Sequence, residues 1–348
     1  MSATAEQSGG TDRSRFVDLV FQGGGMRGIG LVGSFAVLEE QGYLPQRVAG
    51  NSAGAIVGAL VAAGYSAAEL YAILSEFDFR RFEDGEWSHR LPLLPTFSLL
   101  TDLGMYKGEV LLEWLEDLLA AKGVQTFRDL RYVDPDQPRS APLYALQVIA
   151  SNVSQSCALV LPQDATLLGI DPDDLNVALA VRMSMSIPLF FEPVRVRHPE
   201  TGDEHLIVDG GLFSNFPVWL FDSDSVPRWP TFGLRFVEPD PRAAVVASAP
   251  ADRWHLDGLH RDVDFLRSLV HFALDAHDRF SLDHADYART IAISSLGVRS
   301  TEFDLPRDRV LALYEEGRSA AARFLTTWSF DEYIQKFRTP ELVTPATA

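Results

Sequence analysis

The chain has 348 residues, of which 47% are hydrophobic and 22% are charged, as is ordinary for a folded globular protein. Its 48 acidic residues outnumber its 30 lysines and arginines. The resulting formal charge of −18 disfavours nucleic acid as a partner and simple electrostatic docking on anionic lipid. The single cysteine, Cys157, excludes an intramolecular disulfide.

Both ends of the chain are polar. The N-terminal residues lack the apolar core of a secretion signal, so residues 1–15 are interpreted as a disordered tail. The apolar stretch at 55–63 is too short to span a bilayer. We therefore expect a cytoplasmic protein with a single domain over residues 16–328, followed by a polar C-terminal tail over 329–348.

Hydrophobic patterning in the first part of the chain predicts alternating strands and helices. Residues 16–21 form a short apolar run, typical of a buried strand, and 47–49 predict a second strand. Residues 28–41 and 53–63 predict helices with apolar faces. Strand, helix, strand and helix at this spacing are typical of a βαβ unit in a parallel sheet.

Further elements are predicted along the rest of the chain. The predicted helices cover residues 67–76, 109–121, 175–183, 262–280 and 307–324. The predicted strands cover residues 143–150, 157–161, 206–208, 232–237 and 290–294. The irregular segment 77–107 is rich in leucine over 91–106. It is interpreted as a lid, as an acyl-chain wall that could touch a membrane, or as a loop packed on the core.

The sequence GNSAG fits the pattern G-x-S-x-G between a predicted strand and a predicted apolar helix. A nucleophilic serine on such a sharp turn needs small neighbours. The residues around the serine are Gly50, Asn51, Ala53 and Gly54. Ser52 is therefore the candidate nucleophile, at a helix N-terminus whose dipole favours negative charge.

The first predicted strand ends at the glycine loop GGGMRG, which matches the G-x-G-x-x-G of dinucleotide-binding sites. Such sites need an acidic residue after the second strand, where this chain has Ser52 instead. Because the ends of neighbouring parallel strands open onto one crevice, the loop and Ser52 should face each other. The N–H groups of Gly24, Gly25 and Met26 could then stabilise an oxyanion, with Arg27 adding positive charge or holding the loop.

A serine nucleophile needs a base, and Asp209 is the candidate. It directly follows the predicted strand at 206–208. Gly210 and Gly211 come next and let the chain turn tightly, which would leave the carboxylate open to the crevice. The nearest histidine, His205, lies at the opposite end of that strand.

The motifs GGGMRG, GNSAG and DGG, in this order, resemble the three signatures of the patatin-like phospholipases. The stretch AVRMSMSIPLFFEPV resembles the serine- and proline-containing stretch that precedes the aspartate in that family. The motif-bearing core covers residues 16–220. The resemblance implies a three-layer α/β fold with a mostly parallel central sheet and helices on both faces.

The resemblance also implies an activity. A serine acyl hydrolase of this family would cleave fatty-acyl ester bonds of phospholipids or other lipids through a Ser52–Asp209 dyad, without an intervening histidine, a metal or another cofactor. The residues that match the oxyanion loop are Gly23, Gly24, Gly25, Met26, Arg27 and Gly28. The implied partners are a lipid or ester substrate and, transiently, a membrane surface; the sequence indicates no particular oligomeric state. The acidic run at 171–174 lacks the pattern of a calcium loop and is interpreted as a helix-cap region.

Other interpretations stay open. An α/β-hydrolase-type esterase would use a Ser-Asp-His triad, although the late histidines His271, His277 and His284 fall in or near a predicted helix. A nucleotide-binding module would use the glycine loop and have no esterase activity. An acyl-carrier-type acyltransferase would normally carry a histidine where this chain has Asn51.

Overall fold

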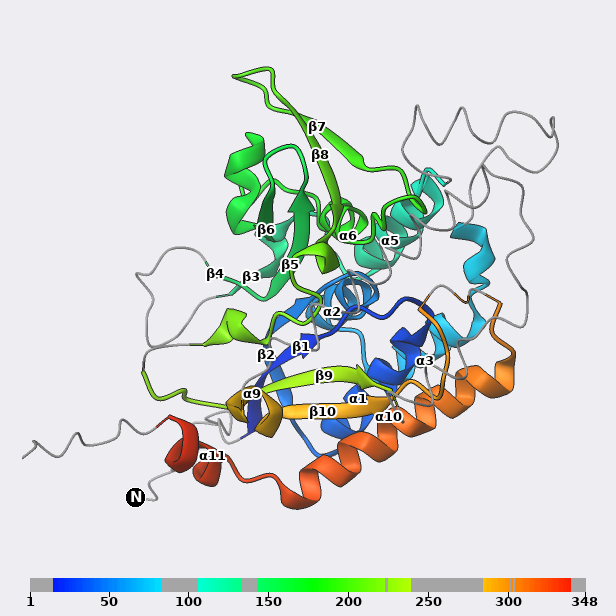
Figure 1. The fold of residues 1–348 in the computed structure, drawn as a ribbon, viewed down its shortest axis with the longest axis vertical. Coiled ribbons are helices and arrows are strands. Elements are labelled where there is room, and N and C mark those ends of the chain that lie inside the picture. Colours follow the sequence, from blue (N-terminus) through cyan, green and yellow to red (C-terminus); the bar gives the residue numbers. More distant parts are fainter. Residues whose placement is uncertain are drawn as a thin grey trace, which may run out of the picture.

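The structure is a computed structural model, and it describes residues 15–82, 106–132, 143–222, 225–238, 284–300, 302 and 304–338. Within these residues, helices pack against an eight-stranded sheet (Figure 1). The predicted helix at 262–280 lies outside the described residues, as do nearly all of the apolar segment 91–106 and of the predicted N-terminal tail.

The strand order is β10-β9-β1-β2-β5-β8-β7, with β6 pairing with β5. The parallel strands are β1 (Phe16–Phe21), β2 (Leu44–Gly50), β5 (Leu146–Asn152), β9 (Thr231–Val237) and β10 (Thr290–Ser294). The antiparallel strands are β6 (Cys157–Leu161), β7 (Val194–Arg197) and β8 (Glu204–Asp209). A separate ribbon pairs β3 (Arg131–Tyr132) with β4 (Leu143–Tyr144).

Most predicted helices are present within a few residues of their expected bounds. The described α-helices are α1 (Gly28–Glu40), α2 (Ala53–Ala62), α3 (Ala67–Glu76), α5 (Glu109–Ala121), α6 (Val177–Ser184), α9 (His284–Ala288), α10 (Arg307–Thr327) and α11 (Phe330–Phe337). Short 3-10 turns include η2 (Gly25–Arg27), η3 (Phe79–Phe82), η5 (Phe127–Leu130), η6 (Gln163–Leu168), η7 (Gly210–Leu212) and η8 (Val218–Phe221). Among the described helices, none is long and apolar enough to cross a bilayer.

The core lies on both faces of the parallel strands because their side chains alternate. On β1, Leu19 and Phe21 pack into the main cluster with α1, α2 and α10, and α10 lies alongside α1 (Figure 1). Val20 points the other way and packs with Phe216 and Phe221, in and beside η8. The predicted α/β class, with a mostly parallel sheet flanked by helices, is confirmed.

The C-terminal segment differs from the expected polar tail. Residues 330–337 form α11, which Ser329 caps by accepting a hydrogen bond from the Glu332 amide at 3.3 Å. Tyr333 is buried against the rings of Trp328 and Phe337. Aromatic burial on one face of this short amphipathic stretch accounts for the helix.

The acidic run at 171–174 does not cap α6. The N-cap is Asn176, whose side chain accepts from the Leu179 amide at 2.8 Å. Asp173 instead accepts hydrogen bonds from Arg131 and from the Tyr144 hydroxyl, the latter at 3.0 Å. This carboxylate fastens the β3–β4 ribbon to the turn before α6.

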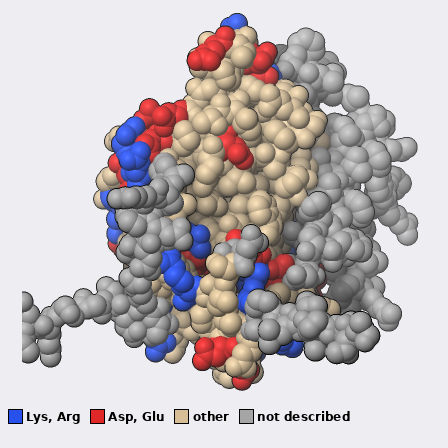
Figure 2. All heavy atoms as spheres, turned by 90° about the vertical axis from the view of Figure 1, so that its left-hand side faces the viewer, with Lys and Arg blue, Asp and Glu red and all other residues tan. Residues whose placement is uncertain are grey.

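Charged side chains are unevenly spread over the surface. On the face shown in Figure 2, Lys, Arg, Asp and Glu gather mainly towards the edges, and uncharged residues cover most of the middle. Charged side chains are therefore sparse in the middle of this face.

Candidate active site

The sheet register brings Ser52 and Asp209 to the same level. Gly50, the last residue of β2, pairs with Val148 of β5, and Asp209 pairs with Ala150, two residues further along β5. Ser52 follows Gly50 by two residues, so Ser52 and Asp209 lie on either side of β5 at matching height. The antiparallel direction of β8 is what carries Asp209 to this position.

Ser52 occupies a strained turn between β2 and α2. Its backbone has φ 52° and ψ −127°, a region that non-glycine residues rarely adopt. The turn passes so close to β1 that a Cβ on Gly54 would lie 2.2 Å from the Phe21 carbonyl oxygen. This geometry explains the small residues of GNSAG, and it is the geometry that a nucleophile elbow would need.

Asp209 is buried, with 2% of its surface exposed, rather than open to a crevice as the sequence suggested. Its Oδ1 accepts hydrogen bonds from the Gly211 amide at 2.8 Å and from Asn51 Nδ2 at 3.1 Å. The Ser52 hydroxyl lies near enough to this carboxylate to stabilise its charged form. Burial raises the pKa of Asp209 to about 6, and these hydrogen bonds to the charged form oppose that rise.

The Ser52 hydroxyl has a second neighbour. Its Oγ lies 3.4 Å from Met185 Sδ, and Ser52 itself is 5% exposed. A hydroxyl has one hydrogen to donate, and a carboxylate is a far stronger acceptor than a thioether. Donation to Asp209 would therefore be the stronger of the two interactions open to this hydroxyl.

The glycine loop follows β1 and leads through η2 into α1. Gly25 has φ 53°, and a Cβ there would lie 1.8 Å from the Ser300 carbonyl oxygen, so only glycine fits. Four of the six loop amides donate to backbone carbonyls, namely those of Gly23, Met26, Arg27 and Gly28. Within the described residues, no carbonyl accepts from the amides of Gly24 and Gly25, which leaves these two as the available donors.

Arg27 holds the loop in place. Its Nε donates to the Gly24 carbonyl at 3.1 Å, and its guanidinium pairs with Glu238 at 3.4 Å. The same group lies over the ring of Phe236 at 5.0 Å. Arg27 was expected either to add positive charge to the site or to hold the loop, and these contacts match the second role.

The histidines described in the structure lie away from this pair. His205 is buried at the start of β8, where its Nδ1 is 3.0 Å from Asn152 Nδ2. His284 begins α9. Within the described residues, no histidine hydrogen-bonds to Ser52 or Asp209; His271 and His277 lie outside them.

Three residues beside the pair have no role in the sequence analysis: Ser184, Met185 and Asn215. Ser184 Oγ accepts from the Ser52 amide at 2.9 Å, and Asn215 Oδ1 accepts from Asn51 Nδ2 at 3.0 Å. The stretch AVRMSMSIPLFFEPV, which contains Ser184 and Met185, was the sequence signal that could have pointed to two of them.

This fold and this arrangement agree with a family comparison. The family model described as patatin-like phospholipase matches residues 19–222, which span the glycine loop, the Ser52 turn and Asp209. The chain belongs to the patatin-like phospholipase family. Membership of this family supports the conclusion that the protein is a lipid-hydrolysing enzyme.

Individual relatives extend this result. A Bacillus subtilis (strain 168) protein named "Uncharacterized protein YqhO" is 36% identical over 317 residues, which cover 90% of this chain and all of that protein. The "Probable lipid hydrolase 463L" of Invertebrate iridescent virus 6 is 22% identical over 200 residues, covering 58% of this chain and 61% of that protein. The crystal structure of VipD from Legionella pneumophila shares the fold, with a TM-score of 0.50 and 16% identity over 90% of this chain and 67% of VipD.

Proposed function

We propose that the protein is a serine acyl hydrolase that cleaves fatty-acyl ester bonds of phospholipids or related lipids, with Ser52 as nucleophile and Asp209 as base. The observation that carries the proposal is that Ser52, in a strained strand-to-helix turn, lies near the buried carboxylate of Asp209, which Asn51 and the Gly211 amide hold in place. Family membership supplies the lipid substrate class.

In the first half of the reaction, Asp209 accepts the hydroxyl proton as Ser52 Oγ attacks the ester carbonyl carbon. The carbonyl oxygen becomes an oxyanion, towards which the amides of Gly24 and Gly25 would donate. Each such donor contributes roughly 3 kcal/mol in other acyl-transfer sites. Collapse of the intermediate breaks the ester C–O bond, and protonated Asp209 gives its proton to the departing alcohol.

In the second half, water attacks the acyl-enzyme while Asp209 takes one of its protons. The fatty acid leaves, and the proton returns to Ser52 Oγ. A pKa of about 6 suits both duties, because Asp209 is mostly ionised at pH 7 and its protonated form is still acidic enough to serve the leaving alcohol.

Hydrolysis of a short p-nitrophenyl ester tests this proposal. We expect Ser52→Ala and Asp209→Asn each to lower kcat by about 10³-fold or more, with circular dichroism unchanged. The matched controls are His271→Ala, His277→Ala and His284→Ala, which should retain most of the rate. Retained activity in Asp209→Asn, or a large loss in one histidine variant, would contradict the dyad.

A further inference from the structure

The Asn51 carboxamide lies fully buried at the centre of the candidate site. Its Nδ2 donates to Asp209 Oδ1 at 3.1 Å and to Asn215 Oδ1 at 3.0 Å. Its Oδ1 accepts from Ser184 Oγ at 3.2 Å. Both hydrogens and one lone pair of the amide are therefore engaged, each with a residue from a different segment of the chain.

The partners fix which way this amide points. Turning it over would place its oxygen against two acceptor oxygens, those of Asp209 and Asn215. It would also leave the Ser184 hydroxyl facing an NH₂ group. The observed orientation satisfies all three contacts, so Asn51 can hold its neighbours in only one arrangement.

Ser184 extends the network to the nucleophile. Its Oγ accepts from the Ser52 amide at 2.9 Å while its own hydrogen goes to Asn51. The backbone of Ser52 and the carboxylate of Asp209 are thus joined through two uncharged side chains. The stretch AVRMSMSIPLFFEPV thus supplies the side chain, Ser184, that accepts the Ser52 amide hydrogen bond.

Asn215 extends the network to the glycine loop. Its backbone carbonyl accepts from the Gly23 amide at 3.1 Å, and its Nδ2 donates to the Gly23 carbonyl at 3.4 Å. Asn51, itself in GNSAG, is therefore linked, directly or through one residue, to the other three motifs that distinguish this sequence.

We propose that Asn51 is a positioning residue for the reaction. It holds the Asp209 carboxylate against Ser52 Oγ and, with Ser184, fixes the Ser52 turn relative to the glycine loop. The inference rests on the proposed function, and it adds a required side chain beside the Ser52–Asp209 pair.

The hydrogen bond from Asn51 is expected to affect the pKa of Asp209, because the charged side chains nearby are engaged elsewhere. The charged or titratable side chains on the elements around Asp209 include Arg182 on α6, Arg27 in η2, and His205 and Glu204 on β8. Glu204 pairs with Arg195 of the neighbouring strand β7 at 2.9 Å. Arg182 is held by Ser186 and by backbone carbonyls, Arg27 by the loop and Glu238, and His205 faces Asn152. Burial and uncharged hydrogen bonds, including that from Asn51, therefore set the pKa of Asp209.

The pH dependence of ester hydrolysis separates positioning from a packing role. In Asn51→Leu, ionised Asp209 loses a donor, so we expect the acidic limb of kcat/KM to move upward by about one pH unit and the plateau kcat to fall at least tenfold. Asn51→Asp, which keeps the shape but adds a second carboxylate, should move the limb further. Ser184→Ala should lower kcat without moving the limb, because Ser184 does not touch the carboxylate.

Ser151→Ala is the matched control. Ser151 is a buried serine on β5, opposite Val208, and its Oγ has no hydrogen-bond partner among the described residues. We expect this variant to have the same kcat as the wild type and the same acidic limb in the pH profile of kcat/KM. An unmoved limb in both folded Asn51 variants, or an equal shift in Ser151→Ala, would overturn the proposal.

A second readout does not depend on turnover. Selective ¹³C labelling of aspartate carboxyls, with Asp209→Asn for assignment, follows the Asp209 titration directly by NMR. The Asp209 resonance should titrate at higher pH in Asn51→Leu than in the wild type, and an unchanged titration would contradict the inference. Loss of the proposed function would appear separately, as absent hydrolysis by the wild type or full activity in Ser52→Ala.

Discussion

At the residue scale, the site depends on a carboxylate held in an unfavourable environment. Asp209 has no cation beside it in the described residues, and burial raises its pKa to about 6. A carboxylate that stays ionised at neutral pH without full solvation is a better base for a serine hydroxyl. Two consequences can be measured.

The first concerns activity. Because Asp209 must be ionised to accept the Ser52 proton, kcat/KM should fall on the acid side with an apparent pKa near 6. The rate at pH 5 should be about tenfold below the plateau. Steady-state hydrolysis of a neutral ester across pH 4.5–8 measures this. A flat profile down to pH 5 would rule out Asp209 as the titrating base.

The second concerns stability. The pKa of Asp209 is higher in the folded protein than its ordinary value of 3.8, so the folded state binds this proton more tightly than the unfolded state. The stability from this group is therefore complete below about pH 4 and is lost as the pH rises through 6. Asp209→Asn cannot ionise, so this variant should avoid the loss in the free energy of unfolding at high pH, which we estimate at about 1–3 kcal/mol.

Thermal unfolding at two pH values checks the sign. The Tm of Asp209→Asn should exceed that of the wild type by several degrees more at pH 8 than at pH 4.5. An equal difference at both pH values would show that burial does not penalise the charged form.

Some residues of the candidate site have a local sequence pattern around them, and others do not. Ser52 and Asp209 could be proposed from the sequence, because a strand and a tight turn with small residues leave a local pattern around each. Asn215 was not predictable, and for Ser184 the stretch AVRMSMSIPLFFEPV indicated the region but not the contact, because both contacts arise only in the folded chain. No spacing along the chain records that a serine 132 residues away accepts the Ser52 amide.

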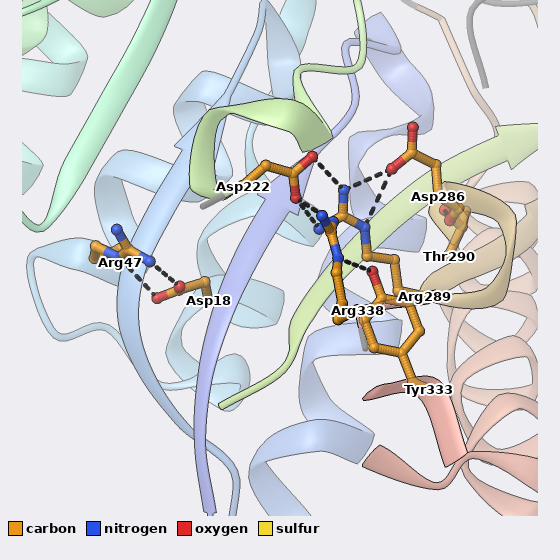
Figure 3. Close-up of polar contacts among 8 residues, drawn as sticks. All are labelled: Asp18, Arg47, Asp222, Asp286, Arg289, Thr290, Tyr333 and Arg338. Carbon is orange, nitrogen blue, oxygen red and sulfur yellow. Dashed lines mark hydrogen bonds and ion pairs between the residues drawn. The ribbon is translucent and has the colours of Figure 1, made fainter. Parts of the chain in front are cut away.

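At the element scale, a partly buried ion cluster ties the segment after Asp209 to the C-terminal helix (Figure 3). Arg289 is 3% exposed and donates to both oxygens of Asp222, at 2.7 and 3.0 Å, and to Asp286. Arg338, just after α11, donates to Asp222 at 2.7 Å and to the Tyr333 hydroxyl at 3.2 Å. Asp222 follows η8, so the cluster joins the segment that begins at Asp209 to β10 and α11.

Removing the central cation should destabilise the fold. Arg289→Met removes the buried cation from two carboxylates that are themselves partly exposed, and Arg338 still pairs with Asp222, so we expect a loss of about 1–3 kcal/mol. Urea unfolding measures the loss. The matched control is Arg318→Met, because Arg318 pairs with Glu40 at 2.7 Å near the surface, where such pairs contribute less than about 1 kcal/mol. Equal losses in the two variants would contradict a structural role for the cluster.

Some secondary-structure elements were predicted correctly from the hydrophobic pattern, and others were missed. The strands at 16–21 and 290–294 were predicted at their observed bounds, because continuous apolar or alternating runs carry their own signal. Helix α11 was missed because its burial depends on Trp328 and on the distant Asp222. The antiparallel direction of β8 was also beyond local patterns, since strand direction depends on the path of the connecting chain.

At the scale of the whole molecule, the net charge of −18 acts on any lipid surface that the protein approaches. Anionic vesicles should repel it, whereas zwitterionic vesicles should not. We expect phospholipid hydrolysis in low salt to fall several-fold as the anionic lipid fraction rises, and to recover in 0.5 M salt as the repulsion is screened. A soluble neutral ester is the control, and its rate should not depend on salt. Faster hydrolysis of anionic vesicles at low salt would contradict this expectation.

The central claim is that Ser52 is the nucleophile and that Asp209, without a histidine, activates it. The most direct measurement is labelling by an alkyl fluorophosphonate, in which serine Oγ attacks phosphorus and fluoride leaves, followed by peptide mass spectrometry. The account predicts a single adduct on Ser52 in the wild type and in the three histidine variants, and labelling at least 100-fold slower in Asp209→Asn. An adduct on another residue, or undiminished labelling of Ser52 in Asp209→Asn, would contradict it.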